Sequence, residues 1–185
     1  MDTPTHALIP VIVYGVMRQK ELCYGTRGEK IAVWRTAVLT GFVGAMPDMM
    51  DPHVTLEERL NSWSHSLVAW FGFSVLFGVI SLALKRWVSP VLAAGLSATY
   101  FSHIVGDAIA GGVGWSYPFG HHVIGDYYII PEWWIPADFV CFAVAYVVYR
   151  VVPMFASRRR QHQEVKKRRE ATLAEVGVTA EVEGE

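Results

Sequence analysis

The sequence has 185 residues, which is enough for one domain. Hydrophobic residues make up 52% of it and charged residues only 18%, whereas a soluble domain has about 25% charged residues. The apolar residues form long blocks between short charged segments, a pattern that is typical of a helical membrane protein and argues against a soluble enzyme. The formal net charge is −1 because an acidic end, residues 175–185, offsets several basic segments. The total charge therefore says nothing about partners.

Five apolar segments follow one another along the chain. The first is too short to cross a hydrocarbon core of about 30 Å unless it is held against other helices or is re-entrant. The second carries Arg35 in its first turns, from where the guanidinium can reach the interface. The third has no charge and is the clearest spanning helix, and the fifth begins at Trp133 and Trp134, which suit an interfacial anchor. The segments are residues 7–17, 31–46, 67–84, 87–105 and 134–152.

These segments predict an all-α fold, a polytopic membrane bundle of about five segments within residues 1–156. Residues 157–185 are polar and charged, and we expect a tail there that begins as a frayed helix and is partly disordered near its end. The bundle carries the candidate chemistry, and the tail lies outside it.

Basic residues indicate the orientation of the bundle. With five segments, three basic groups fall on one side of the membrane, and short loops rich in Lys and Arg are cytoplasmic. We therefore predict a multi-pass protein of the plasma (inner) membrane, with its N-terminus outside and its C-terminus in the cytoplasm. The expected partner is the lipid bilayer, since a basic tail beside a span contacts anionic lipid, and no nucleic acid is expected. The groups are Arg18, Lys20, Arg27 and Lys30; Lys85 and Arg86; and the bases after Arg150.

Six His and Asp residues gather at the predicted outer ends of these segments. His103 and Asp107 are four residues apart, so both side chains lie on one face of a helix. Bundle interiors are common places for metal sites, and mixed imidazole and carboxylate ligands suit Zn²⁺, Mn²⁺ or Fe²⁺. The sequence predicts a divalent metal site, with Zn²⁺ or Mn²⁺ first and one or two ions. The six residues are His6, Asp48, Asp51, His65, His103 and Asp107.

A single His or Asp at a helix end is more often a cap or an interfacial group than a ligand. Six at one membrane face shift the balance, because ionisable groups near a membrane interior are costly. Asp138 fits a simpler role, complementing the dipole of the last helix, and His53, His121 and His122 fit exposed loops.

Five motifs in order resemble a known family. The sequence is similar to the LexA-binding, inner-membrane-associated metal-dependent hydrolases, the YdjM-like family, over about residues 1–150. The resemblance implies that the six residues above are ligands or catalytic groups: His6, Asp48, His65, His103 and Asp107 as metal ligands, and Asp51 as ligand, supporting partner or general base. The motifs are Thr5-His6, Gly44-Ala-Met-Pro47-Asp48-Met-Met-Asp51, Ser64-His65-Ser66, His103-x-x-x-Asp107 and Trp115-Ser-Tyr-Pro118-Phe119.

One position departs from the family pattern. His-Arg often precedes the Thr-His-Ser element there, and Leu60 and Asn61 stand here instead. Arg59 or His53 is a candidate to replace a missing ligand or phosphate-binding group. Two functions therefore compete. The first is a membrane-bound metal-dependent hydrolase acting on a phosphoester or lipid-linked substrate at the outer face. The second is a non-catalytic membrane protein with a structural or ion-binding cluster, or one that binds a protein partner.

Overall fold

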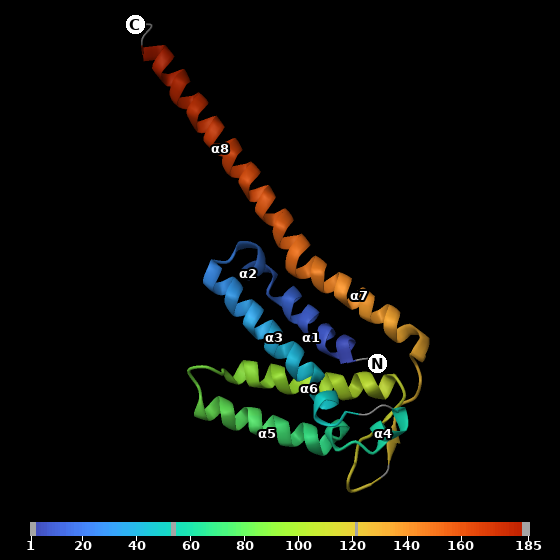
Figure 1. Cartoon of the computed structure of the whole chain (residues 1–185). Helices are drawn as coiled ribbons and strands as arrows, with labels where there is room; N and C mark the ends of the chain where they lie inside the picture. Colours follow the sequence, from blue (N-terminus) through green and yellow to red (C-terminus); the bar gives the residue numbers. More distant parts are fainter. Residues whose placement is uncertain (1–2, 53–54, 121, 183–185) are drawn as a thin grey trace.

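The computed structural model describes residues 3–52, 55–120 and 122–182, and the chain is mostly helical there. All five apolar segments form helices, as predicted. They correspond to α1 (Thr3–Met17), α3 (Arg27–Met50), α5 (Leu67–Ala83), α6 (Pro90–Ile109) and α7 (Trp134–Tyr146) (Figure 1). Short helices connect them: α2 (Gln19–Tyr24), α4 (Leu56–Leu60) and the 3₁₀ turns η1 (Trp63–His65) and η2 (Pro131–Trp133). The predicted all-α class is confirmed, apart from one small hairpin of β1 (Val113–Gly114) and β2 (Val123–Ile124).

Local signals explain where the long helices begin. Thr26 caps α3 in a capping box with Glu29, in which each side chain accepts from the other residue's backbone N–H. Ser66 caps α5, and Ser89 caps α6 directly before Pro90, a residue that is favoured in the first turn. These hydroxyls satisfy N–H groups that the first helical turn leaves without partners.

One long helix ends the chain. A five-residue π-helical stretch, η3 (Val147–Val151), joins α7 to α8 (Val152–Val182), so that the helix runs out past the other elements (Figure 1). The tail is thus helical as far as Val182, further than its composition suggested. Exposed ion pairs four residues apart support it, Arg160 with Glu164 at 3.1 Å and Lys166 with Glu170 at 3.8 Å.

Two clusters of buried side chains hold the helices together. In one, Tyr100 and Ile104 of α6 pack with Val43 of α3. In the other, Tyr149 packs near Gly15 of α1, where a Cβ would lie 2.5 Å from the tyrosine ring, and its hydroxyl donates to the Val11 carbonyl at 2.9 Å. Glycine is therefore needed at position 15 for the close approach of the last helix.

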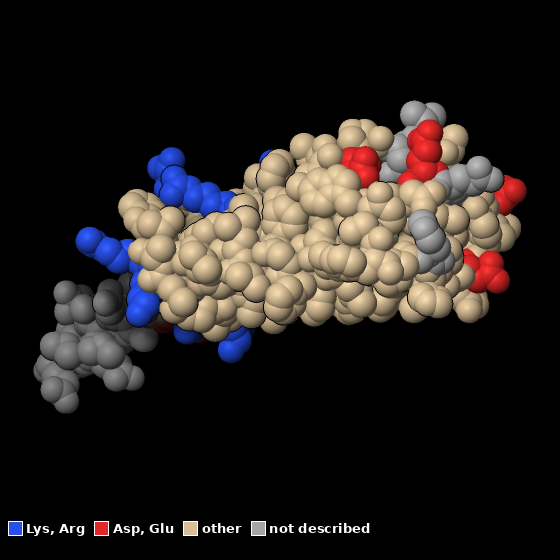
Figure 2. All heavy atoms as spheres, turned by 90° about the horizontal axis from the view of Figure 1, so that it is seen from below, with Lys and Arg blue, Asp and Glu red and all other residues tan. Residues whose placement is uncertain are grey.

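Much of the remaining surface is apolar. Phe71, Leu82 and Phe139 are among many large hydrophobic residues with more than half of their surface exposed, far more than a soluble monomer tolerates in one region. Figure 2 shows a broad uncharged belt with Lys and Arg at one end of the molecule and Asp and Glu at the other. Within the described residues, one helix, Pro131–Thr172, is by itself long and apolar enough to cross a membrane.

Candidate metal centre

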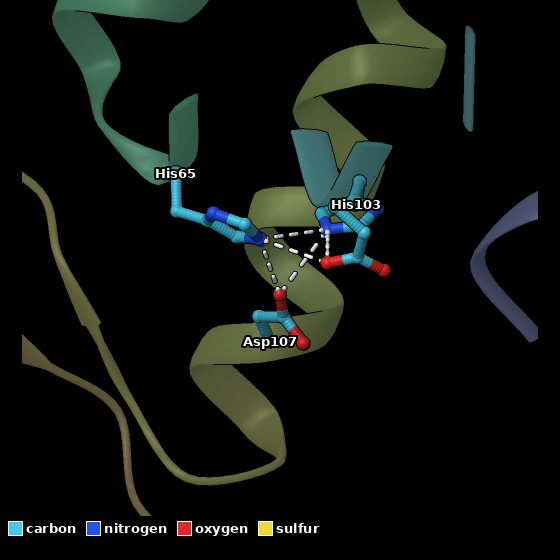
Figure 3. Close-up of side chains that lie close together, drawn as sticks. His65, His103 and Asp107 are labelled. Carbon is cyan, nitrogen blue, oxygen red and sulfur yellow. Dashed lines mark hydrogen bonds and ion pairs between the residues drawn. The ribbon is translucent and has the colours of Figure 1, made fainter. Parts of the chain in front are cut away.

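Three elements bring four His and Asp side chains together. Asp48 comes from the last turn of α3, and His65 ends η1, just before α5. His103 and Asp107 lie one turn apart on α6, with both side chains turned toward His65 (Figure 3). Asp48 Oδ1, His65 Nε2, His103 Nε2 and Asp107 Oδ2 all lie within 4.8 Å of one another.

The distances between these four atoms fit a common ion. His65 Nε2 lies 3.1 Å from Asp48 Oδ1, 3.1 Å from His103 Nε2 and 3.2 Å from Asp107 Oδ2. His103 Nε2 lies 3.3 Å from Asp48 Oδ1 and 3.2 Å from Asp107 Oδ2. A tetrahedral ion with ligands at about 2.0–2.1 Å separates its ligand atoms by about 3.3–3.4 Å. Neighbouring positions of an octahedral ion at similar bond lengths are about 3.0 Å apart, so both geometries are close to the observed one.

Hydrogen bonds fix which nitrogen of His65 carries the proton. The Ser62 hydroxyl donates to Asp51 Oδ2 at 2.7 Å, and the Ser64 hydroxyl donates to the Pro47 carbonyl at 2.8 Å. Each hydroxyl hydrogen is therefore in use, while His65 Nδ1 lies 2.8 and 3.0 Å from the two hydroxyl oxygens. His65 Nδ1 must then be the donor, which leaves the lone pair of Nε2 directed at the group.

His103 is oriented in the same way by the backbone. Its Nδ1 lies 2.7 Å from the Gly44 carbonyl oxygen, an atom that can only accept, so Nδ1 carries the proton. Metal-binding histidines commonly donate their second N–H to a carbonyl in this manner. Protons on both Nε2 atoms would place two like charges 3.1 Å apart, whereas one cation at the centre satisfies both lone pairs and both carboxylates. The donor set therefore fits a divalent metal.

The two carboxyl groups are held in their charged form. They lie just outside the predicted segments 31–46 and 87–105. Burial would raise the pKa of Asp48, but its contacts with the His103 and His65 rings, which can take up a proton on Nε2 when no ion is bound, outweigh it, and the pKa falls well below its usual range. The same balance, with His103 as the largest opposing contribution, lowers the pKa of Asp107. Both groups thus remain acceptors, as metal ligands must.

A buried arginine lies behind Asp107. Arg59 of α4 is 1% exposed, and its Nη1 donates to Asp107 Oδ1 at 2.7 Å. Its Nη2 donates to the Ala110 carbonyl at 3.1 Å. A Cβ on Gly111, which has a φ of +133°, would come within 2.7 Å of that Nη2, so a side chain at position 111 would displace the guanidinium. Arg59 thus places a positive charge on the side of Asp107 that faces away from the four-atom group.

The structure places the two remaining predicted residues beside the group but not in it. His6 Nε2 donates to the charged Asp107 Oδ1 at 3.1 Å, and its ring centre lies 4.0 Å from that of His103. Asp51 is linked to His65 through the Ser62 hydroxyl, which donates to Asp51 and lies 2.8 Å from His65 Nδ1. His122 is exposed, as expected, whereas His53 and His121 lie outside the described residues. The role of each predicted residue in catalysis or metal binding stays a prediction.

Several supporting residues received no role from the sequence, although Thr5, Gly44 and Ser64 stand in its motifs. Ser62, Ser64 and Gly44 orient the two histidines, and Thr3 donates to Asp48 Oδ2 at 2.7 Å. Asp138, interpreted as a helix-dipole residue, accepts a short hydrogen bond from the Thr5 hydroxyl and so ties α7 to α1. The available signals were their place in these motifs and their adjacency, since four of these residues lie within three positions of a predicted ligand or catalytic residue.

Residues 1–173 match the family described as YdjM inner membrane protein. The chain belongs to this family. The match confirms the resemblance suggested by the five motifs and extends it beyond residue 150 into the tail. The family assignment makes this an inner membrane protein, and the structure contains a His–Asp group that could hold a metal ion. No curated protein and no solved structure matches the chain.

Proposed function

We propose that this chain is a membrane-bound, metal-dependent hydrolase that acts on a phosphoester or lipid-linked substrate at the outer face of the inner membrane. The observation that carries the proposal is the four-atom group of Asp48, His65, His103 and Asp107, with both imidazole lone pairs turned to one centre. Zn²⁺ or Mn²⁺ suits this mixed set of ligands.

The distribution of charge supports five spans, with the N-terminus outside and the C-terminus in the cytoplasm. Basic residues mark one end of the uncharged belt and acidic residues the other (Figure 2). The start of α1, the ends of α3 and α6 and the start of α5 lie together at the end that holds the metal group (Figure 1). α1 and α5 have only 15 and 17 residues, so neither is long enough to span alone without a local adjustment of the bilayer.

The bound ion would lower the pKa of a water molecule and polarise an oxygen of the substrate. Asp48 is the most accessible member of the group, with a side chain that is 15% exposed where the other three are at most 1%. Substrate would therefore approach on the side of Asp48, whose second oxygen Thr3 orients. Asp51, through Ser62, holds the His65 ring in place, a positioning role that its contacts favour over direct action as a base.

Arg59 bears on the number of ions. A second metal bound by His6 and Asp107 would need Asp107 Oδ1, and the guanidinium already contacts that oxygen at 2.7 Å. Two cations that share one carboxylate oxygen in a buried site repel each other. We therefore propose one ion per chain.

The number of protein ligands favours a second candidate function, because four of them could fill every coordination position of the ion. Four protein ligands close a tetrahedral zinc site, and closed sites are structural, whereas catalytic zinc keeps one position open. In that case the ion would join α3, η1 and α6 without chemistry. A six-coordinate ion such as Mn²⁺ would leave two positions for water and substrate. The identity of the ion thus separates the two candidates.

Elemental analysis of the purified full chain tests both. We expect about one Zn or Mn per chain in the unaltered protein and in the matched control His122→Ala, whose side chain is exposed. In His65→Ala and His103→Ala we expect metal content and hydrolysis of phosphoesters in mixed lipid micelles to fall together. Full occupancy in both variants would overturn the site. One bound ion without hydrolysis of water-soluble or lipid phosphoesters would establish the structural role instead.

A further inference from the structure

A cavity of about 650 Å³ lies on the side of α6 that faces α1 and α3. α6 crosses the α1–α3 pair at an angle, and the helices separate toward the start of α6 (Figure 1). Aliphatic residues of α1 and α6 form most of the cavity wall, with Thr36 and Thr40 of α3 at its floor. The α1 and α6 rims, for example Val13 and Val91, are more than half exposed, so the cavity opens sideways at the level of the uncharged belt.

We propose that this groove binds one hydrocarbon chain of an anionic phospholipid, with the lipid phosphate at Arg18. The site is separate from the four-atom metal group, and no ligand of that group lines it. The proposal therefore goes beyond the hydrolase and does not require it.

The dimensions of the groove select its occupant. It extends along α6 from Ser89 to Ser102, a span of thirteen helical steps or about 20 Å. The volume divided by that length leaves a mean cross-section of about 33 Å². An α-helix with its side chains is about 10–12 Å across and needs about 80–110 Å². A whole helix would therefore not lie inside the groove, whereas a single extended hydrocarbon chain fits along its length.

Charge selects the head group. Arg18 lines the groove where α1 ends, on the same side as the start of α6. One of its nitrogens contacts Glu21 Oε1 at 3.1 Å, and the side chain is 47% exposed, so a phosphate can accept from its remaining donors. Arg18 belongs to the leaflet on the basic side of the molecule, which is the cytoplasmic leaflet in the proposed orientation.

Two glycines allow a matched test. A Cβ built on Gly95, in the groove wall, and one on Gly72, on α5 outside the groove, each meet no atom within 4 Å. Leucine fits at either position and improves helix propensity, so both variants should fold. Gly95→Leu fills the groove, whereas Gly72→Leu adds the same side chain to another apolar helix.

The full chain is reconstituted in vesicles that contain phosphatidylglycerol with a diazirine in its acyl chain, and the crosslinked residues are mapped by mass spectrometry. We expect crosslinks on groove residues of α1 and α6 that fall at least fivefold in Gly95→Leu and remain in Gly72→Leu. Arg18→Gln should reduce labelling by this lipid several-fold, but not labelling by the same probe built on phosphatidylcholine.

Equal labelling of the two leucine variants, or labels spread evenly over α5, would overturn the proposal. An unchanged preference for phosphatidylglycerol in Arg18→Gln would also overturn the proposal. The same holds if a photoreactive residue placed at position 95 crosslinks to another protein in cells. Near-UV circular dichroism in micelles serves as the folding control, because Gly95→Leu should keep the spectrum of the unaltered chain whether or not an ion is bound. Loss of hydrolysis or of metal in the His65 and His103 variants leaves the lipid result unaffected, so the two proposals fail separately.

Discussion

Replacing Arg59 by methionine removes a buried charge and keeps most of the apolar stem. The guanidinium and Asp107 are both about 1% exposed, and their closest atoms are 2.7 Å apart. At an effective dielectric constant of 20, that distance corresponds to an attraction of about 6 kcal/mol, which the cost of removing both charges from water partly cancels. Removing one partner of a buried pair costs about 3–5 kcal/mol in practice. We expect a loss of unfolding free energy in this range for Arg59→Met.

The size of this loss should depend on metal. Without an ion, Asp107 would keep its charge with one neutralising neighbour fewer. With an ion bound at Oδ2, part of that charge is neutralised from the other side, so Arg59→Met should cost less. By linkage, the folded variant should then bind the ion more tightly than the unaltered chain does.

Unfolding in mixed micelles, followed by near-UV circular dichroism with added Zn²⁺ or with EDTA, measures both effects. Arg86→Met is the matched control, since Arg86 is exposed and surface changes of this kind stay within about 0.5 kcal/mol. A loss for Arg59→Met no larger than that of the control would refute the buried ion pair. An equal loss with and without metal would refute the electrostatic link between Arg59 and the metal group.

Three further predictions follow from the same contacts. Ser62→Ala removes an oxygen that accepts from His65 Nδ1, and we expect metal affinity in a chelator competition to fall about 10–100-fold. Ser157→Ala, in the exposed tail, should leave the metal affinity unchanged. Equal affinities of the two variants would argue against the assigned tautomer of His65. Gly44→Ala would place a Cβ 2.5 Å from the His6 carbonyl oxygen, so α1 must shift away from α3. We expect this variant to unfold at a lower denaturant concentration than Gly78→Ala, whose new Cβ meets no atom within 4 Å. Coincident unfolding curves would contradict this packing. The third prediction concerns orientation and uses intact cells and a Cys141→Ser background. A Cys that replaces Thr55 should react with an impermeant thiol reagent, whereas native Cys23 should not. The reverse pattern would show that the chain has the opposite orientation in the membrane.

The helices and part of the site follow from the sequence alone. Long apolar segments predict helices because a bilayer contains no water to hydrogen-bond the backbone. The backbone N–H and C=O groups must therefore bond to one another, as they do in a helix. The spacing of His103 and Asp107 places both on one face of one helix, whatever the rest of the chain does. Similarly, Ser66 and Ser89 mark helix starts by local hydrogen bonds that need no distant partner.

Membership of the metal group depended on tertiary structure. His6 and Asp51 fitted the pattern as well as Asp48 and His65 did, yet the crossing of α1, α3 and α6 turns His6 to the far oxygen of Asp107 and leaves Asp51 behind Ser62. Arg59 stands in a charged stretch with two glutamates, and the sequence marks it only as a candidate to replace a missing ligand or phosphate-binding group, not as the partner of Asp107. It is buried because Gly111 adopts a positive φ and leaves room for the guanidinium.

The lipid groove shows the same division. Composition determines that α1, α3 and α6 are apolar helices, because each must hide its backbone and present side chains that suit a bilayer. The angle at which these helices cross comes from side chains that interlock between residues far apart in sequence, such as Val43 with Tyr100 and Ile104. A helix's own sequence specifies the pattern of its surface but not the neighbour that it meets, so the cavity, the choice of ligands and the position of Arg59 were decided only when the helices packed.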